Sequence, residues 1–170
     1  ALIVNYIGHG GERGWAHERI LNLETIQSWT NRRRLPVFMT ATCELFRHDD
    51  PETYSAGEAI LFNPDGGAVS LLTTTRTVYS AGNQQVNRAF FETALDEGDG
   101  SRCLGDIYLA TKNSETITSH TNARNFSLMG DPALALAYPK HQVHFTEVPD
   151  TLRSLDRVVV KGFVGDAAGN

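Results

Sequence analysis

Apolar runs and helically spaced apolar residues alternate along the first 138 residues of the chain. Residues 1–7 are almost continuously apolar, which is typical of a strand that helices cover on both faces. Asn22 is suited to cap a helix, because apolar residues follow it at a spacing of three. The run VFMTATC over residues 37–43 is apolar again. This order predicts a strand, a helix and a second strand parallel to the first.

The same alternation continues further along the chain. Ser55, followed three residues later by Glu58, forms a capping box and predicts the start of a second helix. The apolar run over residues 68–74 predicts a third strand. The remaining predictions are a helix with an apolar stripe from Val86 and an end near Gly98, a short helix over residues 104–112, and a Gly-Asp-Pro turn with a short extended piece over residues 126–139. Together these elements predict an α/β sandwich around a mostly parallel sheet.

The pattern changes after residue 138. Between residues 143 and 164 the apolar residues lack helical spacing, and polar turns separate them. We therefore expect residues 139–170 to form a linker and the first strands of a β-rich domain. The chain opens directly in a strand-like run and closes on a Gly-Asn turn signal, so we expect it to be a fragment of a longer protein.

Composition and charge narrow the classes of partner. The net charge of −5 gives no reason to expect a nucleic acid partner, and the basic cluster at residues 32–34 is interpreted as a solvated loop. No apolar run approaches the ~20 residues that cross a bilayer. Two cysteines are too few for a disulfide framework in 170 residues, so free thiols are the simpler interpretation.

A histidine and a cysteine stand at the ends of the first two predicted strands. His9 follows the first strand, and Cys43 ends the second. Carboxyl ends of neighbouring parallel strands meet at one edge of a sheet, so we expect the two side chains to lie together. A nearby imidazolium favours the reactive thiolate and supplies the proton that a leaving group needs. The pair predicts a cysteine nucleophile, with the backbone amides of Gly10 and Cys43 as donors to an oxyanion.

Each of these residues alone is weak support for catalysis. A histidine beside glycine is usually a turn residue, and a cysteine in an apolar strand is usually a small core side chain. His9, His17 and Cys43 could ligate zinc in principle, but their spacing matches no common structural zinc pattern. Cys103 stands at a helix start without a nearby histidine, which favours a buried structural thiol. What favours catalysis is the position of His9 and Cys43 at consecutive strand ends.

Other segments near this edge are weaker candidates for metal binding or for the lining of a substrate cleft. The loop over residues 47–58 is acidic enough for a calcium ion, but it lacks the ligand spacing of an EF-hand, and most such loops are simply solvated. Trp15, Glu44 and Arg76 are candidates for the lining of a substrate cleft, because each lies in a loop after a predicted strand. We also expect Trp15 to brace the His9 loop, with local packing as the alternative. The alternative for the segment that contains Arg76 is that it only connects two elements. We therefore expect no cofactor at the site. The sequence leaves open whether a structural calcium ion binds.

The chain resembles the gingipain family of caspase-like cysteine peptidases over about residues 1–138. The resemblance rests on the order of four segments, YIGHGGERGW, FMTATCE, GEAILFNPDGGAVSLLTTTR and NFSLMGDPALALAYP. It implies a caspase-like α/β sandwich without its N-terminal part, followed by the start of an immunoglobulin-like domain. It also implies that His9 is the catalytic histidine, that Cys43 is the nucleophile, and that the amides of Gly10 and Cys43 form the oxyanion hole.

Within this family, the chain is most similar to the sortases of the type IX secretion system. The resemblance implies cleavage of C-terminal sorting domains from exported proteins, and transfer of those proteins to a surface lipopolysaccharide through a thioester on Cys43. The implied partners are these protein substrates and other subunits of the secretion system. The implied location is the outer membrane and cell surface of a Gram-negative bacterium. The residues themselves leave open a degradative endopeptidase and a non-catalytic caspase-like scaffold.

Two departures from related patterns limit what the resemblance carries. The caspase signature Gln-Ala-Cys-x-Gly is TATCE here, so no caspase specificity is expected. In gingipains, the acidic residue that orients the histidine and a residue of the primary specificity pocket precede the His-Gly motif. We expect both to lie outside this sequence. Glu12 and Glu44 are nearby carboxylates, and the sequence gives neither of them that role.

Overall fold

The computed structural model describes residues 2–96, 102–118, 120–139, 141–151, 154–155 and 157–166. The chain forms two compact units, residues 1–136 and residues 137–170. The sequence predicts a boundary between residues 138 and 139, close to this division. His9 and Cys43 both lie in the first unit, which therefore holds the whole candidate site.

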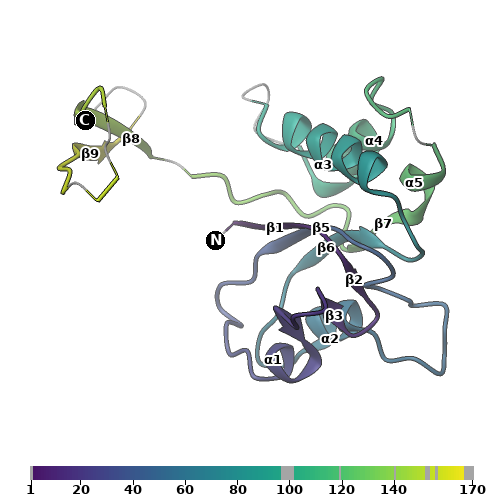
Figure 1. Cartoon of the computed structure of the whole chain (residues 1–170). Helices are drawn as coiled ribbons and strands as arrows, with labels where there is room; N and C mark the ends of the chain where they lie inside the picture. Colours follow the sequence, from purple (N-terminus) through teal and green to yellow (C-terminus); the bar gives the residue numbers. More distant parts are fainter. Residues whose placement is uncertain are drawn as a thin grey trace. The chain divides into compact units, whose positions relative to one another are not determined.

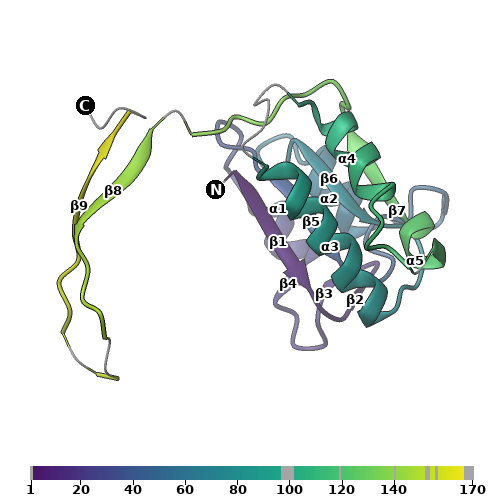
Figure 2. The ribbon, with the colours of Figure 1, turned by 90° about the horizontal axis from the view of Figure 1, so that it is seen from above.

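A four-stranded sheet forms the centre of the first unit, in the order β1-β5-β6-β7 (Figure 2). Its strands are β1 (Ile3–Ile7), β5 (Val37–Ala41), β6 (Ser70–Thr74) and β7 (Phe126–Gly130). The first three strands are parallel, and β7 runs antiparallel to β6. The α/β sandwich with a mostly parallel sheet that the sequence predicts is confirmed.

Helices cover both faces of this sheet (Figure 1). They are α1 (Leu23–Gln27), α2 (Ala56–Phe62), α3 (Ser80–Ala94), α4 (Leu104–Lys112) and α5 (His120–Asn125). Figure 1 shows α1 and α2 on one face of the sheet, and α3 and α4 on the other. Because both faces are covered, every residue of β5 and β6 is buried.

Two of the helix starts follow from local sequence. The Asn22 side chain accepts a hydrogen bond from the Thr25 amide at 2.8 Å, which satisfies a free donor in the first turn of α1. At the start of α2, the Glu58 carboxylate accepts from the Ser55 amide at 2.8 Å and from the Ser55 hydroxyl at 2.6 Å. Both predicted caps are confirmed.

The hydrophobic core has a layer on each side of the sheet. Phe38 pairs with Leu71 across β5 and β6, and both pack into the cluster that includes side chains of α1 and α2. The next pair, Met39 and Leu72, points to the opposite face because strand residues alternate. All four side chains are 3% exposed or less. Burial of each contributes roughly 1.5–3 kcal/mol, which makes the two central strands the rigid base of the site.

The structure departs from the sequence predictions beyond residue 80. Helix α3 ends at Ala94, earlier than the expected end near Gly98, which lies outside the described residues. Helix α5 has no counterpart in the predictions, because its sequence HTNARN carries no apolar stripe. Strand β7 occupies residues where only a turn and an extended piece are expected. The turn itself follows β7, where the Asp131 side chain accepts from the Ala133 amide at 2.8 Å.

A second, small sheet follows β1. It consists of β2 (Gly10–Gly11), β3 (Gly14–Trp15) and β4 (Leu21–Asn22), all antiparallel. Gly14 has a φ of +136°, and a Cβ there would lie 1.9 Å from the Leu21 carbonyl oxygen, so only glycine fits. Strands of two residues carry no period in their side chains, and the sequence therefore does not reveal this sheet.

The second unit contains an antiparallel hairpin of β8 (Gln142–Glu147) and β9 (Lys161–Gly165). Most of its residues are exposed, including Phe145 and Phe163. The interpretation of residues 139–170 as the start of an immunoglobulin-like domain stays a prediction. Among the described residues of both units, no helix has the length and apolar character that a membrane span requires.

Candidate active site

His9 and Cys43 leave the main sheet from neighbouring strands at matching positions. Ile7 in β1 pairs with Ala41 in β5, and the Gly8 amide continues the ladder by donating to the Ala41 carbonyl at 3.3 Å. His9 and Cys43 each follow this last pair by two residues. Hydrogen-bonded strands are about 4.8 Å apart. The topology therefore brings the imidazole and the thiol to one edge of the sheet, on adjacent loops.

The backbone of His9 is fixed by two hydrogen bonds. Its carbonyl oxygen accepts from the Tyr6 hydroxyl at 2.7 Å and from the Ala16 amide at 2.8 Å. Burial, and then the charge of Glu18, raise the pKa of Tyr6, which keeps the hydroxyl protonated and able to donate. The His9 side chain is exposed, and its ring centroid lies 6.4 Å from that of His17. An exposed imidazole on a fixed backbone is well placed to meet a substrate.

Gly10 lies against the end of strand β5. A Cβ at this position would be 2.3 Å from the Thr42 hydroxyl oxygen, so no side chain fits. The missing side chain makes room for Thr42. Gly10 pairs with Trp15 at a non-hydrogen-bonded position, because the preceding residue, His9, accepts the ladder bond from Ala16. The Gly10 amide therefore points away from β3.

The loop after β5 turns sharply at the residue that follows the candidate nucleophile. Glu44 has a φ of +50°, in the left-handed region that non-glycine residues rarely adopt. Its amide donates to the Arg76 carbonyl at 3.4 Å. The partly buried Cys43 thiol donates to the Val78 carbonyl, with a sulfur–oxygen distance of 3.6 Å. The thiol therefore faces the loop between β6 and α3.

Buried polar side chains hold this end of β5 in place. The Asn83 side chain donates to the Ala41 carbonyl at 3.1 Å, and the Thr74 hydroxyl donates to the Thr42 carbonyl. The amide of Asn122, a residue that is 1% exposed, donates in turn to the Asn83 side chain at 3.2 Å. Buried polar groups are costly unless they are hydrogen-bonded, so this network fixes the backbone on which the thiol stands.

A charged cluster joins the loop after β5 to the hairpin after β1. The Arg47 guanidinium forms ion pairs with Glu12, with Asp50 at 3.3 Å and with Glu44 at 3.9 Å. The hydrogen bond with Glu12 is the main cause of the raised pKa of Arg47. The two carboxylates that lie near the site in the sequence, Glu12 and Glu44, therefore face Arg47.

A second ion pair lies at the rim of the site. The exposed Arg76 guanidinium donates through both terminal nitrogens to the Asp49 carboxylate, with one of the two distances at 2.9 Å. This hydrogen bond lowers the pKa of Asp49 to about 2. Asp49 and Asp50, at the centre of the acidic loop, thus both face arginines. Across the part of the chain that the structure describes, no three His, Cys, Asp or Glu side chains are grouped closely enough to hold a metal ion.

Trp15 and Cys103 lie elsewhere than the sequence suggests. Trp15 is 8% exposed, and its ring stacks on Tyr6 with centroids 4.4 Å apart and an interplanar angle of 7°. The large apolar ring supports the His9 loop from the core, as expected, but it does not line the pocket beside His9. Cys103 is only partly buried, and its sulfur lies 3.1 Å from an Asp106 carboxylate oxygen. The expectation of a buried structural thiol is wrong.

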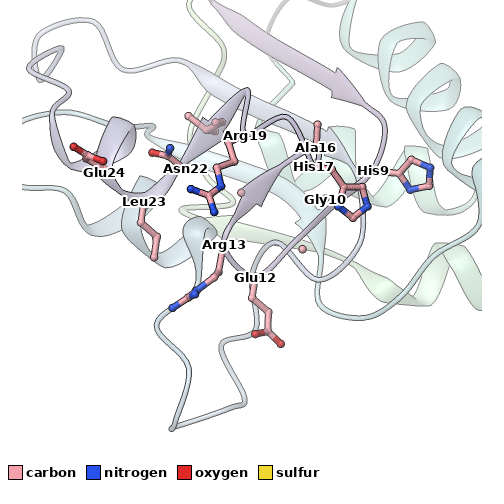
Figure 3. Close-up of a pocket in the computed structure, with 13 residues that line it drawn as sticks. His9, Gly10, Glu12, Arg13, Ala16, His17, Arg19, Asn22, Leu23 and Glu24 are labelled. Carbon is pink, nitrogen blue, oxygen red and sulfur yellow. The ribbon is translucent and has the colours of Figure 1, made fainter.

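A pocket of about 700 Å³ opens beside His9 (Figure 3). The small sheet β2-β3-β4 and the loop before β4 supply its walls. Sequence reasoning missed this pocket, and it also missed Thr42, Arg47 and Asn83. The contacts of these three residues join segments that are more than 30 positions apart, so no local motif marks them.

A parallel sheet that brings an imidazole and a thiol to one edge fits the class of α/β cysteine peptidases. Residues 1–137 match the model of peptidase family C25, and the chain belongs to this family. Membership confirms the resemblance to the gingipains and the class of cysteine peptidase. No curated protein matches the sequence.

Solved structures share the fold. The complex of Porphyromonas gingivalis RgpB pro- and mature domains has a TM-score of 0.67 at 19% identity, covering 84% of this chain and 36% of that one. The Arg-specific cysteine proteinase gingipain R (RgpB) has a TM-score of 0.63 at 21% identity, with the same two coverages of 84% and 36%. A structure described as a protease has a TM-score of 0.62 at 17% identity, covering 94% of this chain and 41% of that one. The chain therefore spans 36–41% of the length of these three proteins.

Proposed function

We propose that this protein is a cysteine endopeptidase in which Cys43 is the nucleophile and His9 the general acid and base. The observation that carries the proposal is the register of β1 and β5. Ile7 pairs with Ala41, and His9 and Cys43 each follow this pair by two residues. This register supports a close approach of imidazole and thiol, which is the minimum equipment of a cysteine nucleophile. Membership of peptidase family C25 supports the same class of reaction.

In the proposed reaction, the Cys43 thiolate attacks a peptide carbonyl carbon, and the carbonyl oxygen becomes an oxyanion. The backbone amides of Gly10 and Cys43 donate hydrogen bonds to that oxygen. The C–N bond then breaks, His9 protonates the departing amine, and the acyl group stays on Cys43 as a thioester. Attack of water on the thioester gives hydrolysis, and attack of an amine gives transpeptidation.

We propose further that the substrates are exported proteins with C-terminal sorting domains, as for the type IX secretion sortase PorU. The order of the four sequence segments that resemble this group supports the proposal. The acceptor is then an amine on a surface lipopolysaccharide, the partners are other subunits of the secretion system, and the location is the outer membrane at the cell surface. The residues of the site are the same for hydrolysis, so the resemblance alone favours transfer.

Replacement of the nucleophile tests the catalytic proposal. In the full-length protein, Cys43→Ala should lower cleavage of sorting-domain cargo by at least about 10³-fold, because no other side chain takes over the nucleophile. Cys103→Ala is the matched control, since it removes the other thiol of the chain, and it should leave cleavage unchanged. Normal cleavage and anchoring of cargo by the Cys43→Ala protein would show that the domain is a non-catalytic scaffold.

Substrate range separates a sortase from a degradative endopeptidase. A sortase should cleave general peptide substrates poorly and sorting-domain cargo well, and mass spectrometry of the product should show an amine-linked adduct in place of a free carboxylate. Efficient cleavage of general peptides, with water as the only acceptor, would favour the degradative endopeptidase.

The thiol–imidazole pair has its own chemical test. At pH 6, iodoacetamide should modify Cys43 faster than Cys103, because a neighbouring imidazolium favours the thiolate. His9→Ala should remove this advantage and leave the rate at Cys103 unchanged. Equal rates at the two cysteines in the unmodified protein would contradict the pairing.

A further inference from the structure

The pocket beside His9 is a groove over the small sheet. Figure 3 shows His9 at one end of it and Glu24 at the other, with His17 and Arg19 between them. Its volume of about 700 Å³ has room for several residues of an extended peptide. Cys43 is not among the residues that line it. The groove therefore begins at the candidate acid and does not include the candidate nucleophile.

The order of strands assigns a side of the site to each half of a substrate. The sheet order β1-β5-β6 places the His9 loop, the Cys43 loop and the Val78 loop one after another along the edge. The Cys43 thiol points to the Val78 carbonyl at 3.6 Å, so the acyl half of a substrate lies toward β6. The departing amine receives its proton from His9, so the leaving half lies toward β1. The residues that line the groove follow β1 in the chain, and His9 is among them.

We propose that this groove binds the polypeptide segment that follows the scissile bond, and that it prefers acidic residues in that segment. The inference rests on the proposed peptidase function, and it adds the chemistry of the leaving half of the substrate to it.

Charge is the first support for the preference. Arg13 and Arg19 line the groove and are exposed, and neither makes an ion pair with another described residue. Of the two acidic residues in the lining, Glu12 is already paired with Arg47. Glu24 lies in the first turn of α1, where the helix amides favour a negative charge. Because Glu24 also makes no ion pair with another described residue, the groove presents two unpaired positive side chains and one unpaired negative side chain to a ligand.

Backbone conformation is the second support. Arg19 has a φ of +55°, a left-handed conformation that is strained for a non-glycine residue, and glycine would avoid that strain. Gly11, in contrast, has no atom within 4 Å of the place where a Cβ would stand, so the fold itself does not require glycine there. Arg19 at a strained position supplies charge to the groove, and Gly11 at an unstrained position leaves space in it.

Matched substrates separate the groove from the catalytic pair. A pooled peptide library cleaved by the full-length protein first supplies a good acyl half. This half is then joined to three acidic residues, to three lysines, or to aminomethylcoumarin, whose small leaving group does not extend along the groove. We expect kcat/KM for the acidic peptide to exceed that for the lysine peptide by about tenfold at low salt, with a smaller ratio at high salt.

Charge variants test which residues make the preference. Arg13→Glu with Arg19→Glu should lower the ratio of acidic to lysine cleavage by at least about tenfold, with each rate normalised to that of the coumarin amide. Arg13→Lys with Arg19→Lys keeps the charge and should keep the ratio. Arg32→Glu with Arg34→Glu makes the same change of charge outside the groove and is the matched control. An unchanged ratio in the Arg13→Glu/Arg19→Glu protein would overturn the inference.

Binding without turnover keeps the two proposals apart. Fluorescence anisotropy on the Cys43→Ala protein should show that the acidic peptide binds about tenfold more tightly than the lysine peptide. Adding Arg13→Glu and Arg19→Glu to this protein should remove the difference. Cleavage of the coumarin amide without any preference for acidic peptides would overturn the groove and leave the peptidase standing. If the protein binds the acidic peptide selectively but the unmodified protein cleaves no substrate, the peptidase proposal is overturned and the groove remains.

Discussion

The loop that carries His9 and the loop that carries Cys43 reach the same edge of the sheet by different means. Close packing and two uncharged hydrogen bonds at the His9 carbonyl hold the His9 loop, with the Trp15 ring stacked on Tyr6 and Gly10 directly against the end of β5. Hydrogen bonds and ion pairs hold the Cys43 loop, with the buried Asn83 amide on one side and the partly exposed Arg47 guanidinium on the other.

The difference determines how each loop responds to its surroundings. Steric fit and apolar contact depend little on salt or pH, whereas ion pairs weaken in salt and titrate with their carboxylates. Changes in the His9 loop should therefore cost similar free energy under all conditions. Changes in the charged part of the Cys43 loop should have effects that shrink in salt or acid.

The largest effect is expected for Trp15. Trp15→Ala removes a ring that is 8% exposed and should lower the free energy of unfolding by about 3–5 kcal/mol at low and high salt alike. Trp15→Phe is the matched control, because the indole N–H has no hydrogen-bond partner among the described residues and Phe keeps an aromatic ring. Urea unfolding at two salt concentrations measures both. A loss for Trp15→Ala below about 1 kcal/mol would show that packing does not hold this loop.

Gly10 is expected to have the next largest effect. In Gly10→Ala the new Cβ would stand 2.3 Å from the Thr42 hydroxyl oxygen, so β2 must shift and unfolding should become easier by about 1–3 kcal/mol. Gly11→Ala is the control, because nothing lies within 4 Å of its Cβ position, and its melting temperature should stay within a degree or two. Equal melting temperatures for the two variants would mean that the contact with β5 is not tight.

Arg47 is expected to affect catalysis more than stability. Arg47→Gln removes the charge that joins Glu12 to the Cys43 loop, and kcat/KM should fall roughly tenfold as the two loops lose their alignment. Thermal unfolding should show a lower melting temperature at low salt and a smaller difference at high salt. Arg88→Gln, which breaks an exposed pair with Glu92 on α3, should change neither quantity. Full activity of the Arg47→Gln protein would contradict the role in alignment.

The smallest effect is expected for Asp49 and depends on pH. Its pKa is lowered from 3.8 to about 2, chiefly by the hydrogen bond with Arg76, so the folded state favours the charged carboxylate. The stabilisation is present above pH 4 and is lost as the pH falls toward 2. Asp49→Asn should therefore melt slightly below the unmodified protein at pH 6, and the difference should shrink as the pH falls through about 2. A difference of the same size at pH 6 and below pH 2 would exclude this ion pair as its source.

Local patterns predicted the parts of the fold that depend on neighbours in the sequence. The apolar runs that became β5 and β6 are buried on a central sheet, and Asn22 and Ser55 begin helices as expected. Strand β1 forms as predicted but lies at the edge of the sheet with no buried residue, so the expectation that helices cover both of its faces is wrong. The arrangement of parallel strands then followed from the lengths of the connections between them. For these elements, propensity, capping and tertiary packing all agree.

The features that the sequence did not predict depend on contacts between distant segments. Strand β7 pairs antiparallel with β6, a choice that the sheet makes and that no local period encodes. The sequence leads us to expect that Trp15 braces the His9 loop, but its burial in the core, instead of in a cleft, follows only from the hairpin of β2 and β3. Arg47 has its partner Glu12 in a different loop, and charge alone could not identify that pair among the 35 Asp, Glu, Lys and Arg residues of the chain.

The stack of Trp15 on Tyr6 also provides a spectroscopic probe of the His9 loop. The chain has two tryptophans, Trp15 and Trp29, and both rings lie 5.9 Å from the ring of Phe38. In a Trp29→Phe protein, the emission of the single remaining indole would come from the residue that supports His9 and receives energy from Tyr6. The emission wavelength and the near-ultraviolet dichroism of that protein would then report, in real time, whether the loop moves when a peptide enters the groove.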